Sequence, residues 1–259
     1  MIRGLDTFKE HFAAFPDSYL MIGSVACHEW YQALGWEFRA TKDLDIVILI
    51  EALTEEFVER FWQFIESGKY EIRQKADGGR VLYRFAKPQE DGYPAVVEVF
   101  SRKPEGITLW ESQTIVPIAL DEAEASLSAI LLDDVYYQLI LNHRVPNSDP
   151  SVVSALALIP LKAKAWLDLV HRKQNGERVD QKDIEKHRAD VFRLAATLTG
   201  DAGPQIDPRV QDDMKQFLAG FPADDPDWVN ILSALRATLG NRAPAPASLL
   251  EAIRETFHL

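Results

Sequence analysis

The fold is decided by residues 21–50, MIGSVACHEWYQALGWEFRATKDLDIVILI. An apolar strand predicted over 18–22 leads through Gly23-Ser24 into a helix predicted over 25–34. A second strand follows at 43–50, which is rich in β-branched residues and continuously apolar after its second aspartate. Such a run is typical of a strand covered on both faces, so this region predicts a sheet with helices beside it.

The rest of the first half continues the alternation of helix and strand. An amphipathic helix is expected over 6–15 and another over 54–66, with Thr54 as its N-cap. Three more strands are expected, over 69–74, 80–86 and 95–101. We therefore predict an α+β (α/β-like) class with a mixed sheet in a first domain of residues 1–120.

The second half, residues 121–259, is predicted to be an all-helical domain. Helical periodicity is read over 132–142, 151–174, 180–198, 207–220, 226–239 and 246–257. Pro160 is expected to split or kink the second of these helices, because proline lacks the N–H that an interior helical turn needs.

Composition indicates an ordinary globular protein. The chain has 259 residues, of which 47% are hydrophobic, and a formal net charge of −12. The acidic balance argues against wrapping of long DNA and against an anionic membrane surface. Cys27 is the only cysteine, which excludes an intramolecular disulfide, and the first residues hold no long apolar run. We expect a cytoplasmic protein with no membrane partner.

Two carboxylates meet at the start of the second strand. Asp43 and Asp45 are separated by one residue, and because side chains alternate along a strand they project from the same face. Glu98 interrupts a later apolar strand, AVVEVFS, and would complete a three-acid cluster if the two strands are neighbours. Mg²⁺ relieves the repulsion between such carboxylates while bridging phosphates, and two ions would suit transfer chemistry. Taken singly, each acid is as readily a strand-end or surface residue.

Gly23 and Ser24 offer a phosphate-binding turn. The glycine lets the backbone approach a phosphate closely, and the serine hydroxyl and free N–H groups at a helix N-terminus can bind it. On its own this pair is also consistent with a plain strand-to-helix turn.

A basic segment lies within the acidic chain. Between Pro160 and Arg193 there are nine Lys and Arg residues against six Asp and Glu, so the remainder of the chain carries −15. A solvated helical face with internal ion pairs is one explanation. Lys162, however, lies in the otherwise apolar stretch SALALIPLKAKAWL, which indicates that something anionic faces it, such as a triphosphate.

These motifs together resemble the DNA polymerase β-like nucleotidyltransferase superfamily. The matching residues are Ile22-Gly23-Ser24, Asp43-Leu44-Asp45 and Glu98, and the run Arg39-Ala40-Thr41-Lys42 is similar to that of the AbiEii/AbiGii toxin branch. The resemblance implies a nucleotidyltransferase-type sheet domain followed by a helical domain. It also implies that Asp43, Asp45 and Glu98 are metal ligands and that Glu98 is alternatively the base.

Two later segments resemble the C-terminal motifs of AbiEii-type proteins. Lys162-Ala163-Lys164-Ala165 fits the first motif, and either Lys182-Asp183 or Arg188-Ala189-Asp190 fits the second. The resemblance implies that Lys162, with Lys164 in reserve, pairs with the triphosphate. Asp183 or Asp190 would position that lysine or the nucleotide, and Arg39 would join the nucleotide-binding residues.

The expected function is therefore that of a Mg²⁺-dependent nucleotidyltransferase (EC 2.7.7-type). It would move a nucleotidyl group from an NTP to a hydroxyl acceptor such as tRNA or a protein, as the toxin of a toxin–antitoxin or phage-defence pair with a cognate antitoxin. The alternatives are a catalytically silent NTP sensor or partner-binding module, and an aminoglycoside-type enzyme acting on small molecules.

Overall fold

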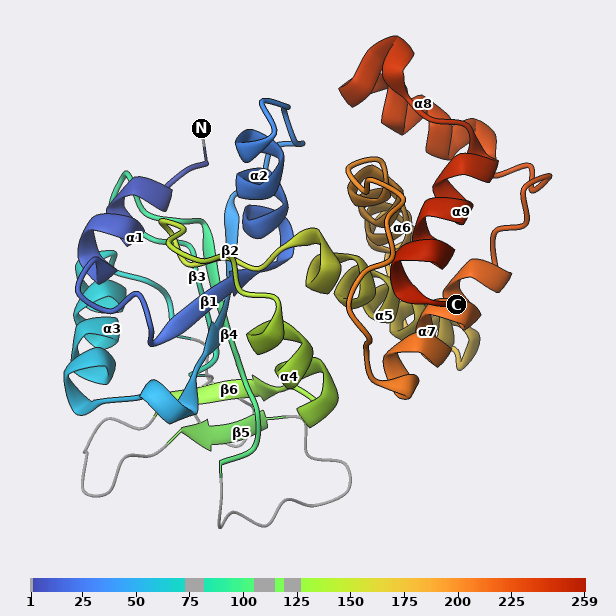
Figure 1. Ribbon diagram of the computed structural model, residues 1–259. Helices are drawn as coiled ribbons and strands as arrows, with labels where there is room; N and C mark the ends of the chain where they lie inside the picture. Colours follow the sequence, from blue (N-terminus) through green and yellow to red (C-terminus); the bar gives the residue numbers. More distant parts are fainter. Residues whose placement is uncertain (1, 73–81, 105–114, 119–126) are drawn as a thin grey trace. The chain divides into compact units, whose positions relative to one another are not determined.

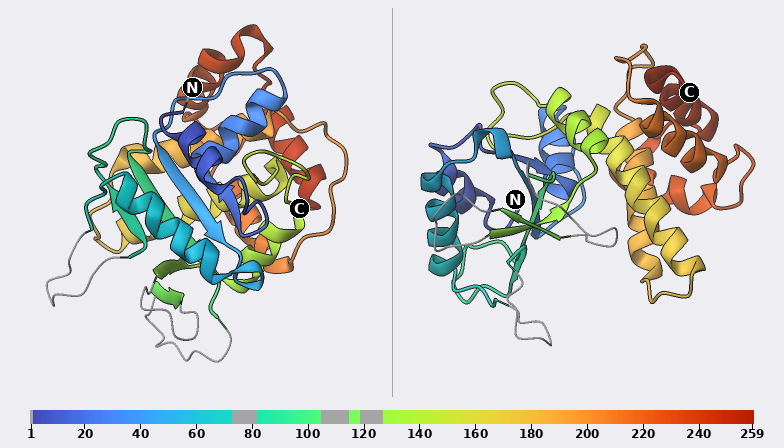
Figure 2. Two further views of the ribbon diagram at one scale, coloured as in Figure 1. Left: turned by 90° about the vertical axis from the view of Figure 1, so that its left-hand side faces the viewer. Right: turned by 90° about the horizontal axis from the view of Figure 1, so that it is seen from below.

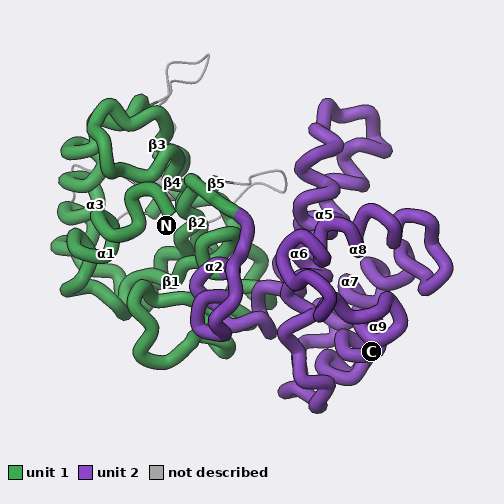
Figure 3. Tube along the Cα trace, turned by 90° about the horizontal axis from the view of Figure 1, so that it is seen from above, with its two compact units in different colours: residues 1–26, 40–153 green, residues 27–39, 154–259 purple. Residues whose placement is uncertain are grey.

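The chain forms two compact units (Figure 3). The computed structural model describes residues 2–72, 82–104, 115–118 and 127–259. Unit 1 comprises Met1–Ala26 and Ala40–Val153, and unit 2 comprises Cys27–Arg39 and Ser154–Leu259. The sequence-based boundary between residues 120 and 121 falls inside unit 1, because strand β6 (Leu127–Leu131) and helix α4 (Asp134–Asn142) continue its fold.

Unit 1 is built on a mixed sheet, as the sequence predicts (Figure 1). Its other described strands are β1 (Tyr19–Ile22), β2 (Asp43–Ile48), β3 (Arg84–Ala86), β4 (Val96–Ser101) and β5 (Ile115–Ile118). Their order is β1-β2-β4-β6-β5, and β3 pairs with the first half of β4. The β2–β4 and β4–β6 pairs are parallel, whereas β1–β2, β3–β4 and β5–β6 are antiparallel. Strand β4 is therefore flanked by β2 on one side and by β3 and then β6 on the other.

Several local expectations need correction. The strand expected over 69–74 is reduced to an isolated bridge at Glu71, with residues 73 and 74 outside the described part, and the strand expected over 80–86 is described only from Arg84. Strands β5 and β6 are not anticipated from the sequence. Residues from 121 onward are therefore not purely helical. The apolar run of β6 is too short for its periodicity to distinguish strand from helix, and its pairing with β5 and β4 decides its conformation.

Helices α1 (Leu5–Phe12) and α3 (Glu55–Ser67) cover one face of the sheet (Figures 1 and 2). Their contact is aromatic, with ring centroids of Phe8 and Phe64 at 5.5 Å. Phe61 packs on Phe85 of β3 with ring centroids 5.7 Å apart, and this contact shows which face of the sheet α3 covers. Thr54 caps α3 as predicted, because its hydroxyl accepts the N–H of Phe57 at 3.2 Å.

Unit 2 is helical, as expected for the C-terminal region. Its described helices are α5 (Ala155–Gln174), α6 (Gln181–Ala195), α7 (Pro208–Ala219), α8 (Trp228–Leu239) and α9 (Pro246–Phe257). Helix α5 lies along α6 and runs without a break from Ala155 to Gln174 with Pro160 inside it, so the helix is not split (Figures 1 and 2). An aromatic cluster fills the centre, and its members are Trp166, Phe192, Phe217, Phe221 and Trp228.

Unit 2 also includes a segment from the first half of the chain. Helix α2 (Gly23–Ala33) starts in unit 1, but Cys27–Arg39 belongs to unit 2. The Tyr31 hydroxyl donates to the carbonyl of Arg193, and Trp30 Nε1 donates to Thr197 Oγ1 at 3.0 Å. Contacts between residues 162 and 167 positions apart in sequence therefore join this segment to the end of α6 and the residues just after it.

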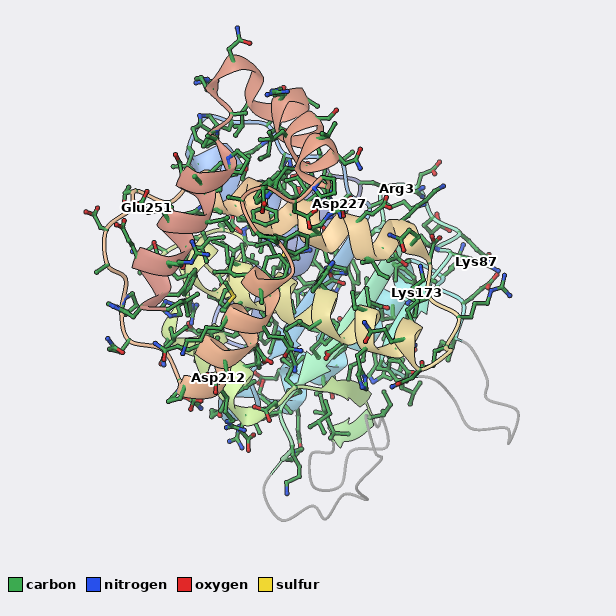
Figure 4. The ribbon with its side chains drawn as sticks, turned by 90° about the vertical axis from the view of Figure 1, so that its right-hand side faces the viewer. Arg3, Lys87, Lys173, Asp212, Asp227 and Glu251 are labelled. Carbon is green, nitrogen blue, oxygen red and sulfur yellow. The ribbon has the colours of Figure 1, made fainter. Side chains whose placement is uncertain are left out.

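The outer helix faces are charged. The side chains of Asp212 on α7 and Glu251 on α9 point outward (Figure 4). Within the described ranges, each helix is too short or too polar to traverse a lipid bilayer.

Candidate functional site

The three predicted acids lie on one face of the unit 1 sheet. Asp45 is directly opposite Glu98 in the parallel β2–β4 pair, and Asp43 is two residues before Asp45 on the same face. The intervening Leu44 and Val97 face the other way and are fully buried. Since Phe85 shares their face and contacts α3, the carboxylates occupy the face opposite to α3. The condition under which Glu98 is expected to join the two aspartates, that the two strands are neighbours, is met in the structure.

Gly23 lies against the carboxylate of Asp45. Its backbone has φ +64°, and a Cβ at this position would lie 1.9 Å from Asp45 Oδ2 and 2.8 Å from Cγ. A side chain is therefore excluded both by the left-handed conformation and by the approach of Asp45. Ser24 follows in the first turn of α2 and is buried. The end of β1 and the start of α2 are thereby held beside the carboxylates.

The charges on this face are unequally compensated. Glu98 forms an ion pair with Arg84 of β3, whereas Asp43 Oδ1 is buried and has no hydrogen-bond partner among the described residues. Burial, reinforced by the negative charges of Asp45 and Asp43, raises the pKa of Glu98 above its ordinary value, and Arg84 opposes this rise. The face therefore carries acids that repel each other and one oxygen without a partner.

Two of these acids, Asp43 and Asp45, are of the kind that holds a magnesium ion. In the described part of the chain, no three or more His, Cys, Asp or Glu side chains are grouped as a ready metal cage. Mg²⁺ does not require one, because proteins hold it with one or two carboxylates together with water and substrate phosphates. Asp43, with its unpartnered oxygen, and Asp45 supply such a pair. Glu98 is engaged by Arg84 instead.

Unit 2 contains a buried cluster in which basic side chains surround a single acid, Asp190. Asp190 of α6 is fully buried and accepts two bonds from Arg39, Nε to Oδ1 at 2.9 Å and Nη2 to Oδ2 at 2.7 Å. Lys162 Nζ of α5 lies 3.3 Å from Oδ2, and Arg193 Nη1 lies 3.1 Å from Oδ1. The lysine is only 5% exposed. Its anionic neighbour in the structure is therefore Asp190.

The cluster lowers the pKa of Asp190, and His187 beside it also has a lowered pKa. Burial alone would raise the pKa of Asp190, but Lys162, Arg39 and Arg193 outweigh it and hold that pKa well below its usual range. His187, one turn earlier on α6, has its pKa lowered to about 3, first by burial and then by the charge of Lys162. Asp190 is thus ionised and His187 neutral at pH 7.

The other predicted residues of unit 2 lie outside this cluster. Lys164 pairs with Asp168 at 3.6 Å and with Asp213 at 3.4 Å. Asp183 is exposed in the first turn of α6. Of the two acids that the sequence leaves open, Asp190 is the one that contacts Lys162.

Sequence reasoning did not single out Arg84 and Arg193. Arg193 follows Asp190 by three residues on a helix, and this spacing brings side chains together. The sequence therefore contained the information needed to predict this ion pair. Arg84 is placed opposite Glu98 by the antiparallel β3–β4 register, which has no local sequence signature.

Comparison with known proteins finds only distant similarity. No protein-family model matches the chain, and no curated protein matches it. Among solved structures, the chain is similar to the crystal structure of an antigenic nucleotidyltransferase-like protein from Paracoccidioides brasiliensis. The two share 15% identity with a TM-score of 0.40, over 92% of this chain and 95% of that chain. A likeness at this level assigns no activity.

Proposed function

We propose that the protein is a Mg²⁺-dependent nucleotidyltransferase that moves a nucleotidyl group from an NTP to a hydroxyl acceptor. The observation that carries the proposal is the sheet face of unit 1, which Asp43, Asp45 and Glu98 share and on which Gly23 lies against Asp45. Carboxylates paired in this way beside a glycine-opened helix are suited to a cation and the phosphates that it accompanies.

In the proposed reaction, the acceptor oxygen forms a bond to the α-phosphorus and the bond to pyrophosphate breaks. Mg²⁺ held by Asp43 and Asp45 would supply neutralisation of the charge that develops on the phosphate oxygens. Glu98 would receive the proton of the attacking hydroxyl or serve as a further ligand. Ser24 and the N–H groups at the start of α2 would bind the terminal phosphates.

The family resemblance proposes cationic residues among the nucleotide ligands. Lys162 and Arg39 are the candidates, and Asp190 fits the role of a positioning residue because it contacts both. Lys164 remains the reserve candidate, although Asp168 and Asp213 already neutralise it. Asp183 makes no contact with Lys162 and is the weaker choice of acid.

The acceptor and biological role remain proposals that derive from the family resemblance. A toxin that acts on tRNA or protein and is opposed by an antitoxin is the preferred form. The ion pair of Glu98 with Arg84 favours one alternative, an NTP-binding module without turnover, because it occupies the proposed base.

Labelled NTP transfer tests the proposal. The purified chain is incubated with each α-labelled NTP, Mg²⁺, and total cellular RNA or protein, and the products are separated on gels. Asp45→Asn should lower transfer on the order of a thousandfold, which corresponds to several kcal/mol of transition-state stabilisation. Asp91→Asn is the matched control, since Asp91 is fully exposed in the same unit. Full transfer by Asp45→Asn would eliminate the metal assignment. Calorimetric NTP binding without any product would instead identify the silent module.

A further inference from the structure

Arg84 occupies a distinctive place on the carboxylate face. In the β3–β4 register it is directly opposite Glu98, and its Nη1 forms an ion pair with Glu98 Oε1. Glu98 therefore has a carboxylate neighbour, Asp45, across β2 and a guanidinium neighbour across β3. The side chain of Arg84 is 46% exposed and that of Glu98 is 21% exposed. The arginine side chain is thus about half exposed, whereas most of the glutamate side chain is covered.

The charge of Arg84 cannot be removed by deprotonation. A guanidinium stays protonated under all ordinary conditions and has no acceptor atom, so it acts as a permanent cation beside the acids. A divalent cation bound by the same carboxylates would gain from Glu98 and would be repelled by Arg84. Arg84 and the divalent cation therefore compete for the carboxylate of Glu98.

We propose that Arg84 is an internal counter-ion that competes with the divalent cation for Glu98 and gives way when that cation binds. The inference depends on the proposed function, because it assumes a cation at Asp43 and Asp45. Before the cation binds, Arg84 compensates the negative charge of Glu98, which otherwise adds to the charges of the two aspartates on the same face. Upon binding, its exposed side chain leaves Glu98 available as ligand or base. Arg84 thereby regulates the affinity of the site for its cation.

Mn²⁺ binding measured by electron paramagnetic resonance tests this competition without any requirement for activity. Arg84→Gln removes the competing charge and should bind Mn²⁺ about three- to fivefold more tightly than the wild-type chain, the range expected for loss of a partly exposed ion pair. Lys87→Gln is the matched control. It removes one positive charge from the residue after β3 and breaks the ion pair with Glu71, and the Lys87 side chain points outward (Figure 4). Its Mn²⁺ affinity should equal that of the wild type.

A double-mutant cycle separates direct competition from a general field effect. In a Glu98→Gln background, Arg84→Gln should change Mn²⁺ affinity by less than about twofold, because the contested carboxylate is gone. Thermal unfolding adds a second readout, in which Mn²⁺ should raise the melting temperature of Arg84→Gln more than that of the wild type.

The outcomes distinguish this inference from the proposed function. Measurable binding with equal affinity in the wild type and Arg84→Gln would overturn the competition and leave the cation site intact. An equal gain from Arg84→Gln in both backgrounds would likewise overturn it. Absence of Mn²⁺ binding in every variant would overturn the cation site and the competition together.

Discussion

Asp190→Asn is the substitution that most directly tests the buried cluster of unit 2. It keeps the shape of the side chain but removes the negative charge that faces Lys162, Arg39 and Arg193. Asparagine has one acceptor oxygen and places an NH₂ group where a second acceptor stood, so one of the two bonds from Arg39 is lost.

The expected cost follows from the burial of these groups. Asp190 is fully buried and Lys162 is 5% exposed, so the lysine would be left in the interior without its anion. Removing one partner of a buried ion pair costs about 3–5 kcal/mol. Arg39, whose side chain is 23% exposed, can recover part of its hydration, which favours the lower end of the range. We therefore expect a loss of about 3 kcal/mol in the free energy of unfolding.

Urea unfolding followed by circular dichroism and tryptophan fluorescence measures this loss. Trp166 and Trp228 lie in the aromatic cluster of unit 2 and report on its packing. With an m value of about 3 kcal/mol/M, the midpoint should fall by about 1 M. Asp183→Asn is the matched control on the same helix, and because Asp183 is exposed its effect should stay within about 0.5 kcal/mol.

Lys162→Met provides the internal check. In the Asp190→Asn background it removes the uncompensated charge, so the double variant should be less destabilised than the sum of the single variants. Equal midpoints for Asp190→Asn and Asp183→Asn, or strict additivity of Asp190→Asn with Lys162→Met, would refute the buried ion-pair cluster.

Three further substitutions test the site and the fold. Gly23→Ala should abolish Mn²⁺ binding measured by calorimetry, because its Cβ would lie 1.9 Å from Asp45 Oδ2, whereas Gly35→Ala, with φ +71° and open space, should retain it. His187 has a folded pKa of about 3 against 6.5 unfolded, so stability should fall by about 1.4 kcal/mol per pH unit below 6.5. Urea unfolding at pH 7, 6 and 5 should show a smaller slope for His187→Gln than for the exposed control His171→Gln. Thr54→Ala should cost about 1 kcal/mol in thermal unfolding, and no loss would contradict the N-cap.

Local features of the fold could be predicted because neighbouring residues determine them. The alternation of β2 places Asp43 and Asp45 on one face whatever the rest of the sheet does. Thr54 needs only the next three residues to cap α3. Helical periodicity located α6 and α9 to within a few residues, since both have apolar stripes that face the interior of unit 2.

Pairings distant in sequence could not be predicted in the same way. The run of β6 is too short for its periodicity to distinguish strand from helix, and its neighbours β4 and β5 decide the matter. The membership of Cys27–Arg39 in unit 2 depends on Tyr31 meeting the end of α6. Arg84 reaches Glu98 through a register that only the folded sheet defines.

Lys162 finds its anionic neighbour in Asp190, one of the two acids that the family resemblance proposes to position it. A lysine in an apolar stretch requires an anion, and Asp190 satisfies that requirement within the protein. The ion pair with Asp190 is compatible with a phosphate as a further ligand of Lys162. Lys162 and Arg193 together carry one charge more than Asp190, and Arg193 Nε is buried without a hydrogen-bond partner in the described structure. A buried positive excess is costly unless an anion compensates it. This buried positive excess supports the proposal that Lys162 binds an anionic ligand.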